Sequence, residues 1–113
     1  MGDHLGGIWT VPQLDHLIAA PGRQGELARA VLDALRGGDE LTTGELGDAL
    51  GIGRGAVSNA LGGLTKIMRG APWLFPFHDG RWPLACGFEP GIDRQWRFWM
   101  TAAQRRSWSR ARG

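Results

Sequence analysis

Residues 41–64, LTTGELGDALGIGRGAVSNALGGL, decide the fold, because their apolar spacing and a single break predict two short helices joined by a tight turn. Thr42 and Glu45 have the spacing of a capping box. In that motif the Thr42 hydroxyl accepts a hydrogen bond from the amide of Glu45, and the carboxylate accepts one from the amide of Thr42. The first helix should therefore begin at this point.

Each of the two helices has an apolar face at helical spacing. The first helix carries Leu46, Ala49 and Leu50 on this face, and the second carries Val57, Leu61 and Leu64. Gly51 stands where a left-handed C-cap would end the first helix without a Cβ penalty. We expect the second helix to begin near Gly53 or Arg54. The two apolar faces should pack into one core.

The free face of the second helix carries residues that suit DNA recognition. They are Arg54, Gly55, Ser58, Asn59, Gly62 and Lys66. In a major groove Arg binds guanine O6 and N7, Asn binds adenine N6 and N7, and Ser and Lys suit phosphates or either base. The alternative is that these are ordinary solvated helix residues. The preceding helix and turn favour the interpretation as a DNA-reading face.

The middle half of the chain resembles bacterial winged helix-turn-helix regulators, of which the MarR-type and GntR-type repressors are examples. The matching residues are Thr42, Glu45, Leu46, Leu50, Gly51, Val57, Ser58, Leu61 and Leu64. The resemblance implies a three-helix core with a wing, in a DNA-binding regulator of bacterial, phage or plasmid origin. Its motif is more specific for the fold than for any one family.

The chain departs from that pattern at several glycines. Such regulators usually have Ser, Thr or Asp where this chain has Gly53, and Ala where it has Gly47. Gly55, Gly62 and Gly63 each weaken a helix by roughly 1 kcal/mol relative to Ala. These glycines either let the helix backbone approach a phosphate or a partner closely, or reflect the glycine-rich composition of the chain.

A hairpin is predicted after the second helix. Residues 73–78 alternate aromatic with other side chains, Asp79-Gly80 is a strong hairpin-turn signal, and Arg81 to Cys86 is predicted as the returning strand. Wings of this superfamily commonly touch the minor groove or flanking phosphates, so Arg81 at the tip is a candidate DNA contact. We expect the aromatic residues to pack the wing onto the helices.

Two further helices are predicted before the central stretch. Residues 24–36 have apolar side chains on one face and form the first helix of the three-helix core. Residues 10–20 should form a short helix with Thr10 as its cap and Pro12 in its first turn. We therefore divide the chain into an N-terminal extension (1–23), a winged helix-turn-helix domain (24–88) and a C-terminal tail (89–113).

The tail from Arg94 to the end is basic and rich in tryptophan, and it has no acidic residue. The apolar spacing predicts a helix from about residue 93 to residue 106. Its candidate DNA contacts are Arg94, Arg97, Arg105 and Arg106, because arginines can follow the phosphate backbone without reading the sequence. The same helix is also suited to pack on its own domain, on a second subunit or on a membrane surface.

The net charge of +2 is the sum of an acidic first part and a basic second part of the chain. Residues 1–50 contain three arginines and eight acidic residues, whereas residues 51–113 contain ten basic and three acidic residues. The basic part holds the predicted recognition helix, wing and tail. Such an asymmetry is expected where one side of a protein meets a polyanion.

Length and composition limit the classes of function. A chain of 113 residues, 42% of them hydrophobic, can form one modest core but has no room for a catalytic domain of usual size. Cys86 has no cysteine partner, the histidines are widely separated, and no phosphate-binding loop or nucleophile motif is present. We expect no enzymatic activity, no cofactor, no metal, no membrane span and a cytoplasmic, nucleoid-associated location.

We predict a mainly α-helical winged helix-turn-helix protein with a small β-hairpin and additional N- and C-terminal helices. It would bind double-stranded DNA as a homodimer and regulate transcription, with the C-terminal helix as a candidate dimer contact. Two alternatives stay open. One is a protein-interaction module that uses the Trp-rich tail. The other is an architectural DNA- or RNA-binding protein in which aromatics such as Trp108 stack on bases.

Overall fold

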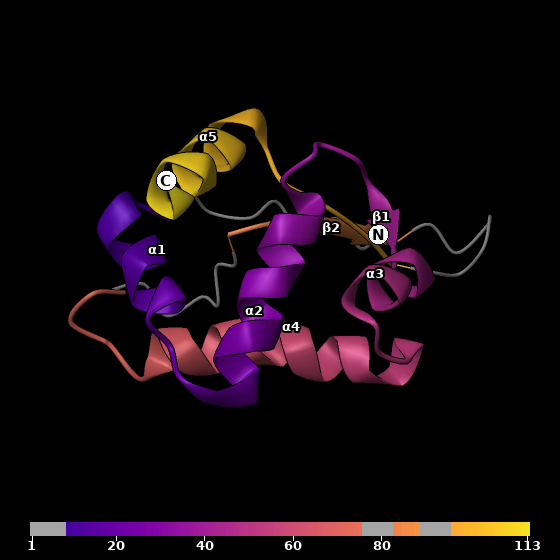
Figure 1. Ribbon diagram of the computed structural model, residues 1–113, viewed down its shortest axis with the longest axis horizontal. Helices are drawn as coiled ribbons and strands as arrows, with labels where there is room; N and C mark the ends of the chain where they lie inside the picture. The colour runs from indigo at the N-terminus through magenta and orange to yellow at the C-terminus, as the bar shows by residue number, and fades with distance from the viewer. Residues whose placement is uncertain (1–8, 76–82, 89–95) are drawn as a thin grey trace.

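The computed structural model describes residues 9–75, 83–88 and 96–113. These residues form a mainly helical fold with a small antiparallel sheet (Figure 1). The helices are α1 (Val11–Ile18), α2 (Gly22–Leu35), α3 (Thr43–Leu50), α4 (Arg54–Arg69) and α5 (Ala102–Arg112). The strands are β1 (Leu41–Thr42), β2 (Ala85–Phe88) and β3 (Trp96–Trp99). In the described part of the chain, no helix has both the length and the apolar character needed to cross a membrane.

The three strands form one antiparallel sheet in the order β1-β3-β2. β3 is the middle strand, and its Phe98 stands opposite Leu41 of β1 and Cys86 of β2. Phe98 and Cys86 are both buried, so this side of the sheet closes the hydrophobic core. Aromatic residues suit such a strand because they pack well on a pleated, buried surface. The last strand of the chain therefore holds the sheet together.

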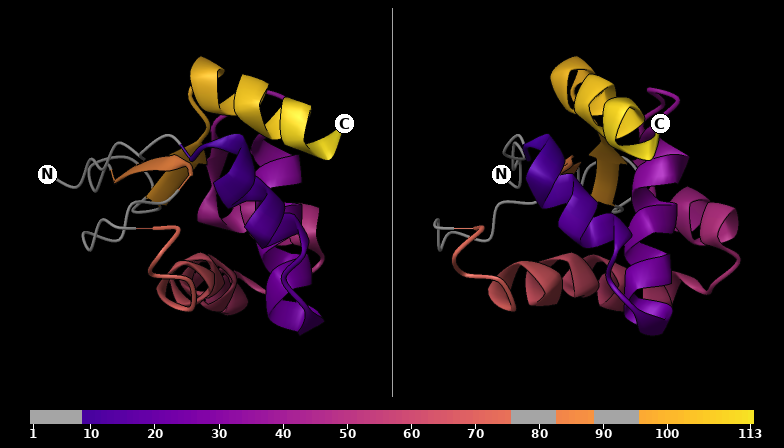
Figure 2. Two further views of the ribbon diagram at one scale, coloured as in Figure 1. Left: turned by 90° about the vertical axis from the view of Figure 1, so that its left-hand side faces the viewer. Right: turned by 60° about the vertical axis from the view of Figure 1, so that its left-hand side comes forward.

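α2 stands at the centre of the helices. In Figure 1 it runs between α4, which lies along the bottom of the molecule, and α5, which lies at the top, and the two turned views of Figure 2 keep this arrangement. The fully buried side chains of the core include Leu14, Leu17, Leu32, Leu35, Leu46, Leu64 and Trp108. One core thus joins the first and last helices to the central ones.

The capping box predicted for α3 is confirmed. The Thr42 hydroxyl accepts from the amide of Glu45 at 3.2 Å, and Glu45 Oε1 accepts from the amide of Thr42 at 2.8 Å. Gly51 ends α3 with a φ of +71°, the left-handed conformation that the predicted cap requires. α4 then begins at Arg54, also as predicted. Ala49 differs from the prediction, because it is exposed rather than part of the buried face of α3.

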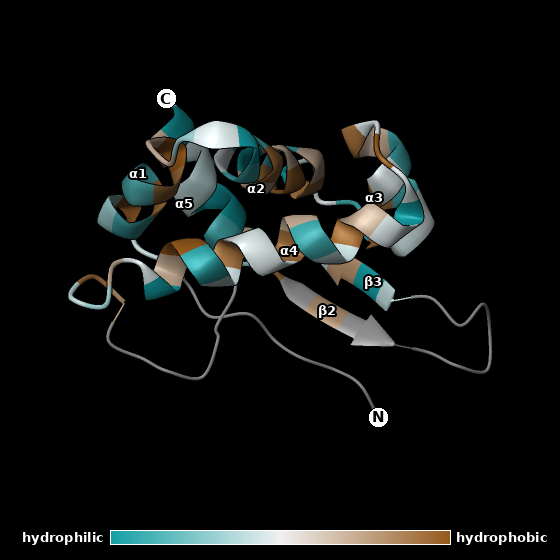
Figure 3. Cartoon of the chain, turned by 90° about the horizontal axis from the view of Figure 1, so that it is seen from below, coloured by the Kyte–Doolittle hydropathy of each residue, from teal (hydrophilic) through white to brown (hydrophobic). Residues whose placement is uncertain are grey.

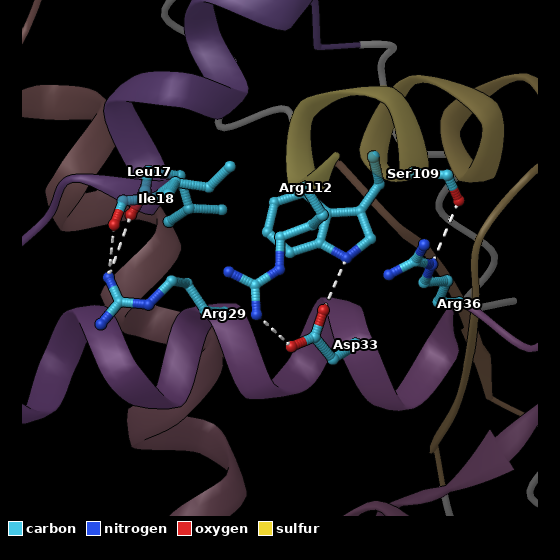
Figure 4. A network of polar contacts seen from close by, with 8 residues as sticks. Leu17, Ile18, Arg29, Asp33, Arg36, Ser109 and Arg112 are labelled. Carbon is cyan, nitrogen blue, oxygen red and sulfur yellow. Dashed lines mark hydrogen bonds and ion pairs between the residues drawn. The ribbon is translucent and has the colours of Figure 1, made fainter.

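Polar contacts tie α1 to its neighbours. Gln13 Nε2 donates to the carbonyl of Leu74 at 2.8 Å, which attaches α1 to the segment that follows α4. At the end of α1, Arg29 of α2 donates to the carbonyl of Ile18 at 2.9 Å (Figure 4). It also donates to the carbonyl of Ala20 at 2.8 Å. A guanidinium suits this place because the last carbonyls of a helix have no donors within the helix. The short helix predicted near the N-terminus is thus confirmed and held on two sides.

The hairpin predicted over residues 73–86 is wrong at its first strand, whereas residues 85 and 86 of its predicted returning strand do belong to a strand, β2. Residues 72–74 form a turn instead of a strand. Phe75 is buried, and its ring centroid lies 4.7 Å from that of Trp9, which draws this segment toward α1. The strand that follows is β2, and within the described residues its partner is β3. The predicted turn at residues 79–81 lies outside the described residues.

The helix predicted over residues 93–106 is also misplaced. Residues 96–99 form the strand β3, because they pair with both β1 and β2. α5 begins later, where the Thr101 hydroxyl accepts from the amide of Gln104 at 3.2 Å and caps the helix. The predicted tail is therefore joined to the rest of the fold by the sheet as well as by α5.

Candidate nucleic-acid interface

α4 has one buried face and one exposed face. The buried residues are Val57, Ala60, Leu61, Gly63, Leu64 and Met68. They pack on α2 and α3 and join the common core. Figure 3 shows the molecule from below, with α4 in front of α1 and α2. The side of α4 that faces away from the core is therefore available to a partner.

The exposed side of α4 gathers the DNA contacts that were predicted on this helix. We call Arg54, Gly55, Ser58, Asn59, Lys66 and Arg69 the α4 face, and all six are exposed. Arg69 was missed by the sequence reasoning, although its spacing of three residues from Lys66 returns it to the same side of the helix. α4 contains no acidic residue. The α4 face therefore has positive and neutral groups alone.

Two hollows flank the α4 face. One of about 320 Å³ lies between α4 and the sheet, and its lining includes Ser58, Gly62 and Trp96. The other, of about 360 Å³, lies between α4 and the turn that joins α1 to α2, with Lys66 in its lining. The α4 face therefore lies between two hollows. A major groove, which is about 12 Å wide and 8.5 Å deep, admits an α-helix.

Four glycines of α3 and α4 fall into two groups. A Cβ on Gly47 would lie 3.0 Å from a backbone carbonyl oxygen, and one on Gly63 would lie 2.9 Å from Cγ of Gln24. Close packing therefore explains these two. A Cβ on Gly55 or Gly62 would meet nothing within 4 Å. Packing within the described structure does not explain these two glycines.

The other predicted contacts lie away from α4. Arg97 is in β3, half-buried, and its Nε lies 3.9 Å from a carboxylate oxygen of Glu40. Arg105 and Arg106 are in α5, at the opposite end of α2 from α4 (Figure 1). The predicted contacts Arg81 and Arg94 lie outside the described residues. The structure thus divides the predicted set between separate surfaces.

The tryptophans differ widely in exposure. Trp108 is fully buried, and its Nε1 donates to Asp33 Oδ1 at 2.9 Å. The prediction that Trp108 stacks on bases is therefore wrong, because its ring is part of the core. Trp73 and Trp96, in contrast, are 78% and 40% exposed.

Among the described residues, no group of three His, Cys, Asp or Glu side chains is placed to hold a metal ion. Comparison of the chain with protein families, with curated proteins and with solved structures found no match. Function is therefore inferred from the α4 face and from the order of the elements.

Proposed function

We propose that this protein binds double-stranded DNA sequence-specifically through α4 and acts as a transcriptional regulator. The observation that carries the proposal is the α4 face, where Arg54, Lys66 and Arg69 stand exposed beside two short polar side chains, Ser58 and Asn59. A helix with these cations and without acidic residues attracts a polyanion. The polar side chains add the means to distinguish bases.

The order of the elements supports a winged helix-turn-helix domain. In the described residues from α2 to β3, the order is helix, strand, helix, helix, strand and strand, and the last strand lies between the other two. This order agrees with the resemblance seen in residues 42–64. In this assignment α3 and α4 are the helix-turn-helix, and the pair of β2 and β3 is the wing.

Arg54 and Asn59 are the proposed base readers. Arg54 stands in the first turn of α4, and the N-terminal residues of recognition helices contact base edges in helix-turn-helix proteins. Its guanidinium would bind guanine, and the Asn59 amide would bind adenine. Ser58, Lys66 and Arg69 would contact phosphates, which fixes the register of the protein on the duplex.

We also propose a homodimer that binds two-fold symmetric DNA in the bacterial nucleoid. The outward side of α5 is a poor dimer contact, because the exposed Arg106 and Arg110 of two copies would meet there. The dimer contact is therefore expected on another surface.

A protein-interaction function is the second candidate, and Trp73 favours it. Its side chain is 78% exposed, and tryptophan is enriched among the residues that anchor protein interfaces. Trp73 follows shortly after the end of α4, so a partner bound there would lie close to the α4 face. In that case Trp73→Ala would abolish partner binding and leave the affinity for DNA unchanged.

Selection of duplexes from a random library, followed by titration, tests the DNA proposal. Asn59→Ala should weaken binding to the selected duplex by about 1–3 kcal/mol and leave binding to random duplex unchanged. Lys66→Ala should weaken both equally and lower the slope of log affinity against log salt by about 0.9. Ser107→Ala is the control, because it removes a polar side chain from α5, away from the α4 face.

Equal losses on all sequences would remove Asn59 as a base reader. Absence of duplex binding at low salt, from protein whose circular dichroism shows the intact helices, would overturn the proposal. The search for a partner would then move to Trp73.

A further inference from the structure

α5 carries a second basic surface. Arg105, Arg106, Ser109 and Arg110 line a shallow hollow of about 520 Å³ along this helix. They share one side of α5, because residues three and four positions apart in a helix are neighbours on its surface. Trp108 on the other side is fully buried and turns this side outward. The lining of the hollow contains no large apolar side chain.

Arg36 of α2 extends this surface. Its Nε donates to Ser109 Oγ at 3.1 Å, which brings its guanidinium beside α5 (Figure 4). We call Arg36, Arg105, Arg106 and Arg110 the arginine row. Two separate helices thus contribute cations to one surface.

The arginine row has no carboxylate partner within the described residues. Ion pairs of other arginines there are Arg112 with Asp33 at 2.9 Å, Arg97 with Glu40 at 3.9 Å and Arg23 with Glu26 at 3.9 Å. The Nε atom of Arg105 is buried, and it has no hydrogen-bond partner among the described residues. Four arginines on one surface, none of them in an ion pair within the described residues, favour the binding of an anion.

The arginine row lies at the other end of α2 from the α4 face. Gln24 at the start of α2 donates to the carbonyl of Gly63 in α4 at 3.2 Å, whereas Asp33 and Arg36 at its end contact α5. The 14 residues of α2 span about 21 Å. Figures 1 and 2 show α4 and α5 at opposite ends of the molecule. Since a major groove is about 8.5 Å deep, a duplex seated on the α4 face does not reach the arginine row.

We propose that the arginine row binds the phosphates of a second DNA duplex, so that one molecule bridges two duplex segments. This inference rests on the proposed function of α4. Guanidinium groups suit phosphates because they donate paired hydrogen bonds in a fixed geometry. A protein partner fits less well, because the cores of protein interfaces use aromatic and apolar anchors that this surface lacks. The second duplex is held without sequence preference, since phosphate contacts carry no sequence information.

A bridging assay with the full chain tests the inference. A selected duplex is attached to beads, a second duplex of random sequence carries a fluorophore, and the fluorescence retained on the beads is measured. The double variant Arg36→Ala/Arg110→Ala should bind the bead-bound duplex as before and retain the second duplex about tenfold less. Both side chains are exposed, so the fold should persist. Arg36→Lys/Arg110→Lys should keep most of the bridging because it keeps the charge.

The reciprocal variant separates the two surfaces. Arg54→Ala/Lys66→Ala should lose the preference for the selected duplex while the arginine row still binds random duplex. Four phosphate contacts in the row predict a slope of about −3.6 for log affinity against log salt in this variant.

Three outcomes would overturn the inference and leave the role of α4 intact. Unchanged retention in Arg36→Ala/Arg110→Ala would assign bridging to the two α4 faces of a dimer. If the protein binds the selected duplex tightly but retains no second duplex, the arginine row does not bind DNA. A change in the mass of the free protein by light scattering, seen with the same variant, would assign the row to a second copy of the chain. Absence of binding to any duplex would instead remove the proposed function itself.

Discussion

α4 and α5 are both basic helices with one buried face, yet they are attached to the molecule in different ways. α4 is held by a broad set of apolar side chains. The buried residues of α5 are Gln104 and Trp108, and each makes a hydrogen bond to a distant segment. Gln104 Oε1 accepts from the amide of Trp9 at 2.7 Å, and Trp108 Nε1 donates to Asp33 at 2.9 Å. Because hydrogen bonds are directional, the anchors of α5 fix how the helix is rotated as well as where it lies.

Loss of the Trp108 anchor should have the largest effect of the changes considered. Trp108→Ala removes a fully buried ring and leaves a cavity, so the free energy of unfolding should fall by about 3–5 kcal/mol. Urea unfolding followed by circular dichroism measures this change. Trp73→Ala is the matched control, because Trp73 is 78% exposed and its loss should cost less than about 0.5 kcal/mol. Equal stability of the two variants would mean that α5 is not part of the cooperative fold.

Substitutions of Asp33 test whether the hydrogen bond of Trp108 stabilises the fold in addition to the packing of the Trp108 ring. Its carboxylate accepts from Trp108 Nε1 and from Arg112 Nη2, each at 2.9 Å. Asp33→Ala leaves the indole N–H inside the fold without an acceptor and should cost about 1–3 kcal/mol. Arg112→Ala should cost at most about 1 kcal/mol, because that ion pair is partly exposed.

Asp33→Asn completes the comparison for this anchor. Asp33→Asn keeps an acceptor for the indole N–H and removes the charge. Its melting temperature in thermal unfolding should therefore be close to that of Arg112→Ala. If Asp33→Asn is instead as unstable as Asp33→Ala, the ion pair rather than the indole hydrogen bond holds α5.

The sequence predicted α3 and α4 well because the interactions that determine them are local. The capping box of Thr42 and Glu45 spans three residues, and the left-handed cap at Gly51 depends on that residue's own freedom. The same periodicity that marked Lys66 as exposed also marks Arg69. Most of the α4 face could therefore be predicted from the spacing of residues within one helix.

The errors fall where distant partners decide the structure. Residues 96–99 fit a helical spacing, but pairing with two other strands makes them β3. Phe75 alternates with its neighbours as in a strand, but its ring packs at a tilt against that of Trp9, near the start of the chain. Arg105 and Arg106 of the arginine row were predicted as DNA contacts, but the sequence did not show that Arg36 lies beside them, because 73 residues separate Arg36 from Ser109.

The glycines of α4 offer the smallest and most discriminating test of its exposed side. Gly62→Ala places a methyl group in open space, so it should raise the free energy of unfolding by about 0.5–1 kcal/mol. Gly63→Ala is the matched neighbour. Its Cβ would meet Cγ of Gln24 at 2.9 Å and disturb the hydrogen bond from Gln24 to the Gly63 carbonyl, which should cancel the gain. If urea unfolding shows that Gly62→Ala and Gly63→Ala raise the free energy of unfolding equally, the contact between α2 and α4 at Gly63 would be contradicted.

Affinity for DNA, measured on the same Gly62→Ala protein, then reports on how closely the α4 backbone approaches its ligand. If Gly62 is present because a phosphate lies against the helix backbone, the methyl group should weaken duplex binding while it stabilises the fold. If the glycine reflects composition alone, affinity should stay unchanged as stability rises. The two quantities move in opposite directions in the first case because the same methyl group is free in the unbound protein and crowded in the complex. Gly55→Ala extends the comparison to the first turn of α4, where the proposed base reader Arg54 stands.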